Sequence, residues 1–393
     1  MYILGKRVDQ LDEADIVRLM NNEIPESKIL DYKRDLKISQ DKDKKEFLYD
    51  ISAMYNTEGG TIIFGIEENK DDNGQNTGTP RRLVGVAIEN IDKLVQQLED
   101  IIRANTDPSI PNIVVKVIDV NHLQIIALGI AKRYGLPSMV TFNESNKFYR
   151  RKNSGKYAVD VHELNIMFMQ NMLIKESAEK FRYARIKSVR VDSVFPNLLS
   201  NPSFFLQIIP FSFMNESILD LTSVREIDFG DLMWPLQSSG YNKMYNYDGF
   251  ATYSSDTFNR QCIVSYDQIF RNGIYEVYTS QLFKQNTNKK GVIVHDLIGD
   301  LLISNSILKV KNGLSVLNKM QIEPPFIVFM SIHGIMGGSI AGVRGSLYEF
   351  SANDMFLPPA IFYNFEERID RNLKPIFDII WQSVGHSSSP NKV

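Results

Sequence analysis

The sequence lacks features that define several common classes of protein. Cys262 is the only cysteine among 393 residues, which excludes an intrachain disulfide and a cysteine-based zinc site. No apolar run reaches the ~18 residues expected of a membrane span. The first residues, Met1 to Arg7, lack the long apolar core of a secretory signal. We therefore expect a cytoplasmic protein that makes no contact with a membrane.

Several catalytic patterns are also missing. None of the five histidines has a partner at metal-ligand spacing, and no Ser/His/Asp arrangement can be singled out. No Gly-Lys-Ser or Gly-Lys-Thr sequence follows a glycine loop, which excludes a Walker phosphate-binding loop. Hydrophobic residues at 43% and charged residues at 23% are ordinary for a globular protein. The length predicts two domains, each with its own core.

The net charge of −3 hides an uneven distribution of charge. Between Lys132 and Arg190, basic residues outnumber acidic ones by more than two to one. A basic segment in a chain that is otherwise near neutral indicates a local anion-binding face. The alternative interpretation is a solvated surface without a ligand.

The first part of the chain reads as one α+β domain over residues 1–175. Apolar periodicity predicts helices at 10–21, 43–56, 91–105 and 159–174, and strands at 29–36, 61–66, 83–86, 113–120, 123–130 and 148–151. Residues 69–80 are rich in Gly, Asn and Asp and are predicted to form a polar loop. The segment 61–66 is nearly all apolar, as expected of a strand that is buried on both faces.

A charged linker, 176–190, is predicted to join this domain to a strand-rich α+β domain over residues 191–386. Residues 387–393 are predicted to be a disordered tail. The second domain is predicted to contain strands at 204–210, 250–253, 261–265, 273–278 and 326–330, and helices at 291–309 and 365–381.

An acid and a lysine share one face of the strand predicted at 29–36. Alternation of side chains puts Asp31 and Lys33 side by side, roughly 7 Å apart at ~3.3 Å per residue. Glu67 and Glu68 follow the next strand and point to opposite faces. In a metal-assisted phosphodiester hydrolase an acid holds the cation and a lysine steadies the phosphate charge. The alternative is an exposed ion pair that contributes little energy.

Two further patterns have a functional and a structural interpretation. Gly59 and Gly60 follow the helix predicted at 43–56, where positive φ is commonly needed, so a helix stop is favoured over a phosphate cradle. Basic residues alternate with aromatic ones near 147–157, which suits phosphate contacts and base stacking or else a soluble strand edge. The candidate nucleic-acid-binding residues are Lys132, Arg133, Lys147, Arg150, Arg151, Lys152 and Lys156.

Three sequence blocks, in the right order, resemble the Schlafen AlbA_2 domain family. They are Glu26-x4-Asp31-x-Lys33, Asn56-Thr57-x-Gly59-Gly60-Thr61-Ile62-Ile63-Phe64-Gly65-Ile66-Glu67-Glu68 and Phe148-Tyr149-Arg150-Arg151-Lys152-Asn153-Ser154. The resemblance covers about residues 10–175 and implies a mixed sheet with flanking helices. Some members of the family are described as ATP- or nucleic-acid-binding modules. Others are described as ribonucleases in which three carboxylates bind a divalent metal.

Carried over residue by residue, the resemblance implies four catalytic residues, namely Glu26, Asp31, Lys33 and Glu68. The carboxylates of Glu26, Asp31 and Glu68 would bind Mg²⁺ or Mn²⁺. Arg151 matches the closing arginine of the family.

The sequence departs from the family pattern in three places. Asp31 stands where Glu is usual, and Glu68 where Asp is usual, so each swap moves a carboxylate by about one methylene. Asn153 stands where the closing block usually has Gly. These departures bear more on the catalytic prediction than on the fold.

The resulting hypothesis is a metal-dependent endonuclease that acts on RNA, with a transfer-RNA-like substrate and a role in defence against phage. A rival hypothesis is a non-catalytic nucleic-acid-binding or regulatory protein whose aromatic-rich second half contacts a protein partner. A third is an ATP-binding module. Eukaryotic Schlafen cores join two such lobes into a clamp, and by analogy a homodimer would rebuild one here.

Overall fold

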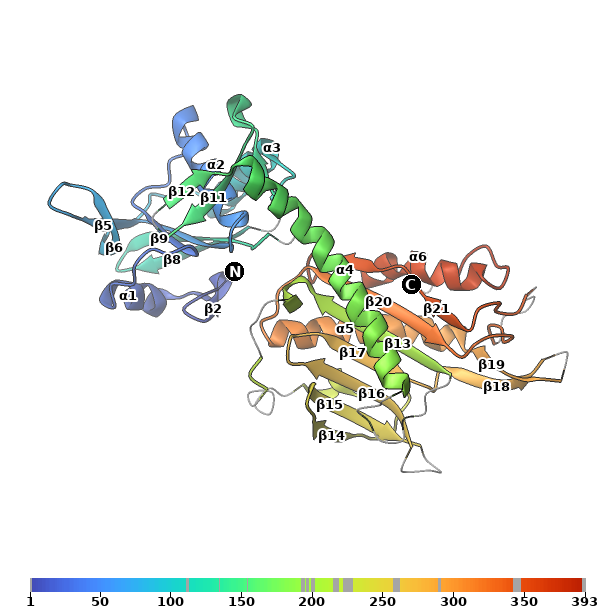
Figure 1. Ribbon diagram of the computed structural model, residues 1–393. Coiled ribbons are helices and arrows are strands. Elements are labelled where there is room, and N and C mark those ends of the chain that lie inside the picture. The colour runs from blue at the N-terminus through green and yellow to red at the C-terminus, as the bar shows by residue number, and fades with distance from the viewer. Residues whose placement is uncertain are drawn as a thin grey trace. The chain divides into compact units, whose positions relative to one another are not determined.

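The computed structural model of this chain divides into two compact units, Met1–Leu173 and Ile174–Val393, and each is described by itself (Figure 1). The structure describes residues 2–110, 113–133, 135–153, 155–191, 195, 198, 202–214, 219–221, 229–256, 262–288, 291–341 and 348–390. No helix within these ranges is both long enough and apolar enough to cross a membrane. Helices and strands both contribute to each unit, which confirms the predicted α+β class.

A mixed four-stranded sheet in the order β3-β4-β9-β8 forms the centre of the first unit. Its strands are β3 (Leu30–Lys33), β4 (Gly60–Phe64), β9 (Leu123–Ile130) and β8 (Val114–Val120). β3 and β4 run parallel, and the other neighbours run antiparallel. Parallel neighbours need a crossover connection, and the helix α2 (Asp41–Tyr55) lies in the connection between β3 and β4.

Helices cover both faces of this sheet, as the resemblance implied. The helix α1 (Glu13–Asn21) packs on one face, and α2 and α3 (Ile91–Asn105) pack on the other. β4 contributes to both cores, because Ile63 joins the α1 side while Ile62 and Phe64 join the α2 and α3 side. Burial on both faces explains why this strand is apolar at successive positions.

Smaller elements surround the central sheet. A second four-stranded sheet has the order β12-β11-β10-β7, and two hairpins are formed by β1 with β2 and by β5 with β6. The strands are β1 (Tyr2–Ile3), β2 (Lys6–Arg7), β5 (Ile66–Lys70), β6 (Asn76–Leu83), β7 (Thr106–Asp107), β10 (Met139–Val140), β11 (Lys147–Lys152) and β12 (Gly155–Ala158). Short 3-10 helices are η1 (Val8–Gln10) and η2 (Phe142–Glu144).

Residues 69–80, predicted as a polar loop, form most of the β5–β6 hairpin instead, so that prediction is wrong. The side chain of Asp71 closes the turn by accepting hydrogen bonds from the backbone N–H groups of Asn73 and Gln75. The strand predicted at 83–86 is also wrong, because β6 ends at Leu83 and residues 84–86 are not in a strand. A hairpin paired through its backbone needs no apolar alternation, which is why composition alone indicated a loop.

The predicted charged linker, 176–190, is helical. It continues the helix predicted at 159–174, and the whole element is α4 (Val161–Val191). The linker sequence contains no Pro or Gly and many residues of high helix propensity. Within the second unit, Arg182 donates hydrogen bonds to the carbonyl oxygens of Met330 and Leu357. The charged residues of this segment therefore anchor a helix as well as extending it.

The second unit is built on an eight-stranded antiparallel sheet in the order β14-β15-β16-β17-β13-β20-β21, with β22 paired to β20. Its strands are β13 (Ser203–Pro210), β14 (Asn242–Tyr245), β15 (Gly249–Ser255), β16 (Ile263–Phe270), β17 (Tyr275–Thr279), β20 (Phe326–His333), β21 (Asp354–Phe356) and β22 (Ala360–Phe362). A separate hairpin pairs β18 (Phe283–Thr287) with β19 (Ile293–Leu297). Short 3-10 helices are η3 (Phe211–Met214) and η5 (Gly230–Met233).

Helices pack on the two faces of this sheet. The helices α5 (Gly299–Lys319) and α6 (Ile369–Gln382) share a core with Phe204 and Leu206 of β13, while Phe205 faces a core that contains Ile186 of α4. Alternation along β13 thus assigns the two helical layers to opposite faces, and α5 and α4 are seen on either side of the strands in Figure 1.

Two predictions for the second unit are wrong in detail. The helix predicted at 291–309 starts only at Gly299, because residues 293–297 form β19. The predicted disordered tail, 387–393, is partly ordered, since the backbone N–H and hydroxyl of Ser389 donate hydrogen bonds to Asp378 at 2.7 and 2.8 Å. Residues 391–393 lie outside the described residues.

Candidate functional site

Strand β3 places Asp31 and Lys33 on the sheet face opposite to Tyr32, which is buried in the α1 core. The two side chains meet, with Lys33 Nζ 2.6 Å from Asp31 Oδ2. The prediction that strand alternation puts them together is confirmed. β3 is the edge strand of this sheet, with β4 as its only neighbour in it.

Asp31 is held by two cations and is 2% exposed. Its Oδ1 accepts a hydrogen bond from Arg151 Nη2 at 2.5 Å, and Arg151 also donates from Nε to the carbonyl oxygen of Ser27 at 3.1 Å. Burial would raise the pKa of the Asp31 carboxyl, but Lys33 and Arg151 hold that pKa below its usual range. Asp31 is therefore an ionised, inaccessible residue that positions Lys33 and Arg151.

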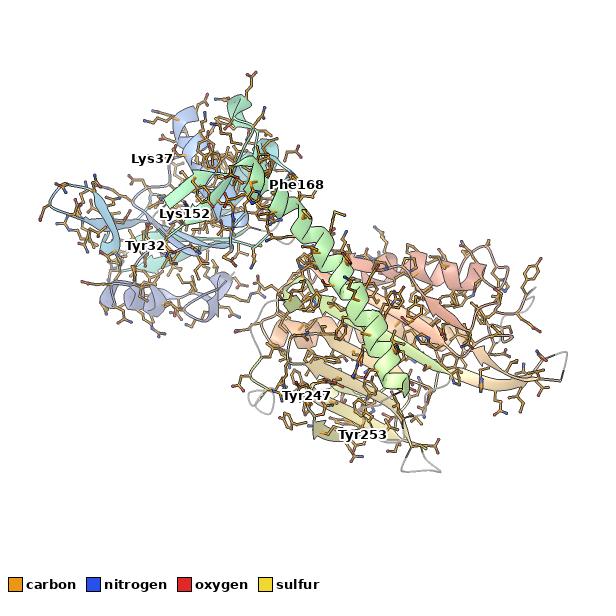
Figure 2. All side chains as sticks on the ribbon, viewed as in Figure 1. Tyr32, Lys37, Lys152, Phe168, Tyr247 and Tyr253 are labelled. Carbon is orange, nitrogen blue, oxygen red and sulfur yellow. The ribbon has the colours of Figure 1, made fainter. Side chains whose placement is uncertain are left out.

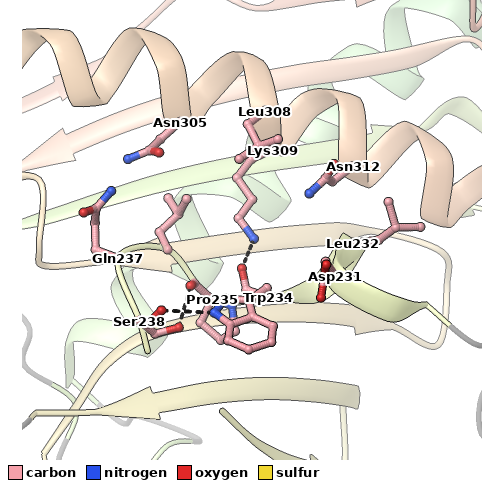
Figure 3. Close-up of a pocket in the computed structure, with 11 residues that line it drawn as sticks. Asp231, Leu232, Trp234, Pro235, Gln237, Ser238, Asn305, Leu308, Lys309 and Asn312 are labelled. Carbon is pink, nitrogen blue, oxygen red and sulfur yellow. Dashed lines mark hydrogen bonds between the residues drawn. The ribbon is translucent and has the colours of Figure 1, made fainter. Parts of the chain in front are cut away.

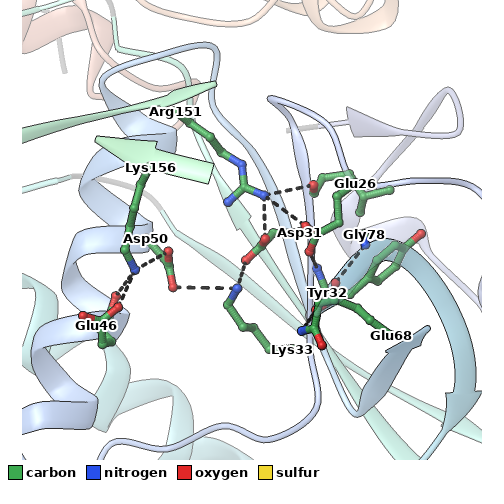
Figure 4. A network of polar contacts seen from close by, with 12 residues as sticks. Glu26, Asp31, Tyr32, Lys33, Glu46, Asp50, Glu68, Gly78, Arg151 and Lys156 are labelled. Carbon is green, nitrogen blue, oxygen red and sulfur yellow. Dashed lines mark hydrogen bonds and ion pairs between the residues drawn. The ribbon is translucent and has the colours of Figure 1, made fainter. Parts of the chain in front are cut away.

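A further acid, Asp50 of α2, extends this set of charges. Its Oδ2 lies 4.0 Å from Lys33 Nζ, and its Oδ1 lies 2.7 Å from Lys156 Nζ (Figure 4). Burial raises the pKa of Asp50 more than Lys33 and Lys156 lower it. The sequence analysis missed Asp50. The available signal was an acid within the apolar stretch 47–55 of an amphipathic helix, where a charge needs a partner.

Glu26 lies just before β3 and is hydrogen-bonded to it. Its Oε1 accepts from the backbone N–H of Tyr32 at 2.8 Å, and its Oε2 lies 3.9 Å from Arg151 Nη2. Burial, followed by the charge of Asp31, raises the pKa of Glu26 to about 8. At pH 7 Glu26 is therefore mostly protonated, and it hydrogen-bonds to Asp31.

The hairpin places Glu68 beside Glu26 through the backbone of Gly78. The N–H of Gly78 donates to Glu68 Oε2 at 3.1 Å, while its carbonyl accepts from the N–H of Glu26 at 2.7 Å. Burial raises the pKa of Glu68, and Lys33 partly opposes this. Glu67 points away and pairs with Arg34 and Arg82. Of the two acids that the sequence left open by parity, Glu68 is the one on the side of Glu26.

We name Glu26, Asp31, Lys33, Asp50, Glu68 and Arg151 the acid–lysine cluster. Among the described residues, no three His, Cys, Asp or Glu side chains are arranged to hold a metal ion. Two cations, Lys33 and Arg151, already contact Asp31. In this arrangement Glu26, Asp31 and Glu68 lie in one region of the domain but do not fit as a ligand set for Mg²⁺ or Mn²⁺.

The predicted nucleic-acid-binding residues do not form one exposed groove. Arg151 and Arg133 are buried, so the prediction of phosphate contacts is wrong for these two. Arg133 donates hydrogen bonds to the carbonyl oxygens of Gly135 and Met167 and to the side chain of Gln170. A guanidinium that is buried among acceptors supports the fold rather than a ligand.

Three more of the predicted residues are engaged in ion pairs. Lys132 pairs with Glu58 at 2.6 Å, Arg150 pairs with Glu163 at 3.3 Å, and Lys156 pairs with Asp50.

The remaining two predicted residues, Lys147 and Lys152, are exposed. Lys152 is labelled in Figure 2. Its Nζ lies 4.6 Å from the centre of the Tyr157 ring. The aromatic–basic pattern therefore has its accessible part here. Ser154, the last residue of the closing sequence block, lies outside the described residues.

Gly59 and Gly60, the two glycines of the second sequence block, allow neighbouring backbone segments to pack closely. A Cβ atom on Gly59 would lie 2.5 Å from the backbone nitrogen of Lys132, and one on Gly60 would lie 2.4 Å from the carbonyl oxygen of Ile29. Both residues have positive φ, 69° and 146°. Their surroundings are filled by backbone, which favours the structural interpretation over a phosphate cradle.

Comparison with known proteins gives a match to a family and likenesses to solved structures, two of which are described here. The family described as "Schlafen, AlbA_2" matches residues 26–160. No curated protein matches. The N-terminal domain of a "RecG-related protein" from Nitrosomonas europaea is 16% identical over 31% of this chain and 74% of that chain, with a TM-score of 0.24. The DIP2311 protein from Corynebacterium diphtheriae is 15% identical over 85% of this chain and 57% of that chain, with a TM-score of 0.27.

At these identities and TM-scores, neither likeness supports a statement about the fold or the function of this chain. The family match is different, because it begins at Glu26 and ends at Asp160, and thus spans all three sequence blocks and the whole acid–lysine cluster. Residues 26–160 of this chain form a domain of the Schlafen AlbA_2 family.

Proposed function

We propose that the AlbA_2 domain acts on nucleic acid, and specifically that it binds RNA and cleaves it at the acid–lysine cluster. The observation that carries this proposal is the position of Glu26, a carboxyl whose burial raises its pKa to about 8, in the same cluster as a fixed cation, Lys33. Their side chains are 18% and 37% exposed, so a strand has access to both, whereas Asp31 at 2% is out of reach. Strongly perturbed carboxyls beside a charged partner are typical of catalytic sites.

These residues support cleavage in which the 2′-hydroxyl of RNA attacks the neighbouring phosphorus. Glu68 takes the proton of that hydroxyl, and Lys33 offsets the charge that develops on the phosphate oxygens. Glu26 gives its proton to the departing 5′-oxygen. The products are a 2′,3′-cyclic phosphate and a free 5′-hydroxyl, and a proton passes back from Glu68 to Glu26 through solvent. Asp31 acts as a positioning residue, since its partners among the described residues include Lys33, Arg151 and Glu26.

A labelled transfer RNA incubated with the purified protein tests this proposal. Glu26→Gln keeps the shape of the side chain and the acceptor for Tyr32, but removes the proton donor. We expect it to lower the cleavage rate by about 10²-fold or more. Glu67→Gln is the matched control, since Glu67 is the next acid in sequence to Glu68 and points away from the cluster; it should cleave at the parental rate. Cleavage by Glu26→Gln at the parental rate would contradict the proposal.

Dependence on Mg²⁺ or Mn²⁺ stays a prediction of the family resemblance. The same assay is therefore run in EDTA and with each metal, and the new ends are analysed. Cleavage in EDTA that leaves a 2′,3′-cyclic phosphate supports the roles given above. Cleavage that requires metal would show that the carboxylates rearrange around a cation, and the roles of Glu26 and Glu68 would then be wrong.

A second candidate function is RNA binding without cleavage. It is favoured by the two cations that neutralise Asp31, since such pairing is also typical of a purely structural network. Retained affinity for RNA, with no cleavage under any of these conditions, would identify this function. A nucleotide-binding role gains no support from Gly59 and Gly60, whose surroundings are filled by backbone.

A further inference from the structure

The second unit contains a cavity of about 570 Å³ between the turn that follows η5 and the helix α5 (Figure 3). Cavities of several hundred cubic ångströms are the usual size for small-molecule sites. The turn contributes Trp234, Leu236 and Gln237, and α5 contributes Asn305, Leu308 and Asn312. The cavity thus combines an aromatic ring, aliphatic side chains and three carboxamides.

Asn305 is the unusual member of this lining. It is 8% exposed, and within the part of the chain that the structure describes its Nδ2 has no hydrogen-bond partner. A buried amide without a partner costs free energy unless something supplies the acceptor. Asn312 lies seven residues further along α5, which is about two helical turns, so it falls on the same face. Both side chains line the cavity.

Trp234 forms a fixed aromatic wall. Its Nε1 donates to the carbonyl oxygen of Ser238 at 3.1 Å. The rings of Trp234 and Tyr241 are in edge-on contact, with their centroids 4.9 Å apart. Lys309 ties the turn to α5 by donating to the carbonyl oxygen of Trp234 at 2.5 Å. Gln237 has a φ of +55°, a strained value for a residue other than glycine. The wall is therefore held in place before any ligand arrives.

The charges of the lining argue against an anionic ligand. Lys309 Nζ lies 2.5 Å from the buried carboxylate of Asp267, so its charge is already neutralised. Asp231 adds a carboxylate to the lining. A neutral planar molecule suits this environment. Each carboxamide offers both a donor and an acceptor, as the edge of a nucleobase requires, and a base stacks well on an indole ring.

We propose that this cavity binds a nucleobase, which stacks on Trp234 and is read by the carboxamides of Asn305, Asn312 and Gln237. The base comes either from a free nucleoside or from an unpaired position of a nucleic-acid strand. This site lies in the second unit and does not depend on cleavage at the acid–lysine cluster.

Fluorescence of the full-length protein tests the proposal. Trp234 and the buried Trp381 are the only two tryptophans, and Trp234→Phe assigns the signal. The four ribonucleosides, AMP and a short single-stranded RNA are titrated separately. We expect saturable quenching by at least one nucleoside or by the strand. If adenosine binds, AMP should bind at least tenfold more weakly, because its phosphate adds negative charge to a lining that already contains the carboxylate of Asp231.

Asn305→Leu separates recognition from folding. It removes an Nδ2 that has no hydrogen-bond partner among the described residues, so the melting temperature without ligand should not fall, while the Kd should rise at least tenfold. Lys311→Ala, on the exposed side of α5, is the control and should bind like the parent. Quenching by nucleosides identifies a free ligand, and quenching by the strand alone identifies an unpaired base. No saturable quenching by any probe, or equal affinity in Asn305→Leu, would overturn the proposal.

Discussion

Glu26 and Asp31 are two carboxyls of one cluster whose surroundings move their pKa values in opposite directions. Asp31 faces Lys33 and Arg151 and stays ionised, while Glu26 faces Asp31 and keeps its proton to about pH 8. The two pKa values shift in opposite directions because Lys33 and Arg151 contact Asp31, whereas Glu26 is buried beside the negative charge of Asp31. Asp31 therefore serves as a fixed negative charge, and Glu26 serves as a proton donor.

The raised pKa of Glu26 predicts a pH dependence of stability. The native state holds this proton up to about pH 8, whereas the unfolded chain releases it near pH 4.5. The stabilisation is therefore complete below pH 4.5 and is lost as the pH rises towards 8. Glu26→Gln removes this dependence. Its free energy of unfolding, relative to that of the parent, should rise between pH 5 and 8 by a few kcal/mol at ~1.4 kcal/mol per pKa unit.

Urea unfolding of both proteins at pH 5, 6.5 and 8 measures this difference. Asp50 and Glu68 also have raised pKa values, but they are present in both proteins, so the comparison isolates Glu26. Parallel pH profiles for parent and variant would show that Glu26 does not hold its proton more tightly in the native state.

Arg151 is predicted to be essential for folding rather than for phosphate contact. Arg151→Met leaves the buried charge of Asp31 with one partner fewer, which should cost about 3–5 kcal/mol in urea unfolding. Its neighbour Arg150 pairs with Glu163 near the surface, so Arg150→Met should cost no more than about 1 kcal/mol. Equal effects of the two substitutions would contradict the structural role given to Arg151.

Part of the site was predictable from local sequence. Alternation along β3 puts Asp31 beside Lys33, and this needs only the strand assignment. Asp50 and Arg151 reach the same cluster from α2 and β11, and no local pattern reveals that they meet Asp31 and Lys33. Likewise, the basic character of Arg133 says nothing of its burial. Tertiary packing determines which residues meet Asp31 and Lys33 and whether Arg133 is buried, and local sequence patterns do not contain this information.

At the scale of elements, the helices and strands with a clear apolar periodicity were the ones that the sequence predicted well. The helix predicted at 91–105 coincides with α3, and the strands predicted at 113–120 and 123–130 are β8 and β9. The β5–β6 hairpin was missed because it is polar and pairs through the backbone, and β19 was missed because its residues were assigned to the helix predicted at 291–309. The extension of α4 was missed because charged residues were interpreted as a linker, although they favour helix.

The packing of α5 yields a prediction at this scale. Gly313 is within the helix, where replacement by Ala normally stabilises by up to about 1 kcal/mol. Here a Cβ atom would lie 2.5 Å from Ile208 Cδ1 and 2.7 Å from Tyr275 Cδ1. Gly313→Ala should therefore destabilise the protein by about 1–3 kcal/mol in urea unfolding. Ser315 of the same helix is half-buried and its hydroxyl donates to the carbonyl oxygen of Lys311, so Ser315→Ala should be close to neutral. A stabilising Gly313→Ala would show that α5 moves freely away from β13 and β17.

At the scale of the whole molecule, each unit has buried clusters of its own. The apolar residues around the mixed sheet belong to Met1–Leu173, and those around the eight-stranded sheet belong to Ile174–Val393. The acid–lysine cluster lies in the first unit and the nucleobase cavity in the second. A homodimer and a protein partner for the second unit stay predictions.

Separate cores predict separate unfolding transitions, which differential scanning calorimetry of the full chain can resolve. Arg151→Met should lower the melting temperature of one transition only, by roughly 6 °C or more for a loss of about 3 kcal/mol. Gly313→Ala should lower only the other, and a nucleoside that binds the cavity should raise that same transition. If both substitutions moved a single transition, the two units would form one cooperative structure, and the continuous helix α4 would be the element that couples them.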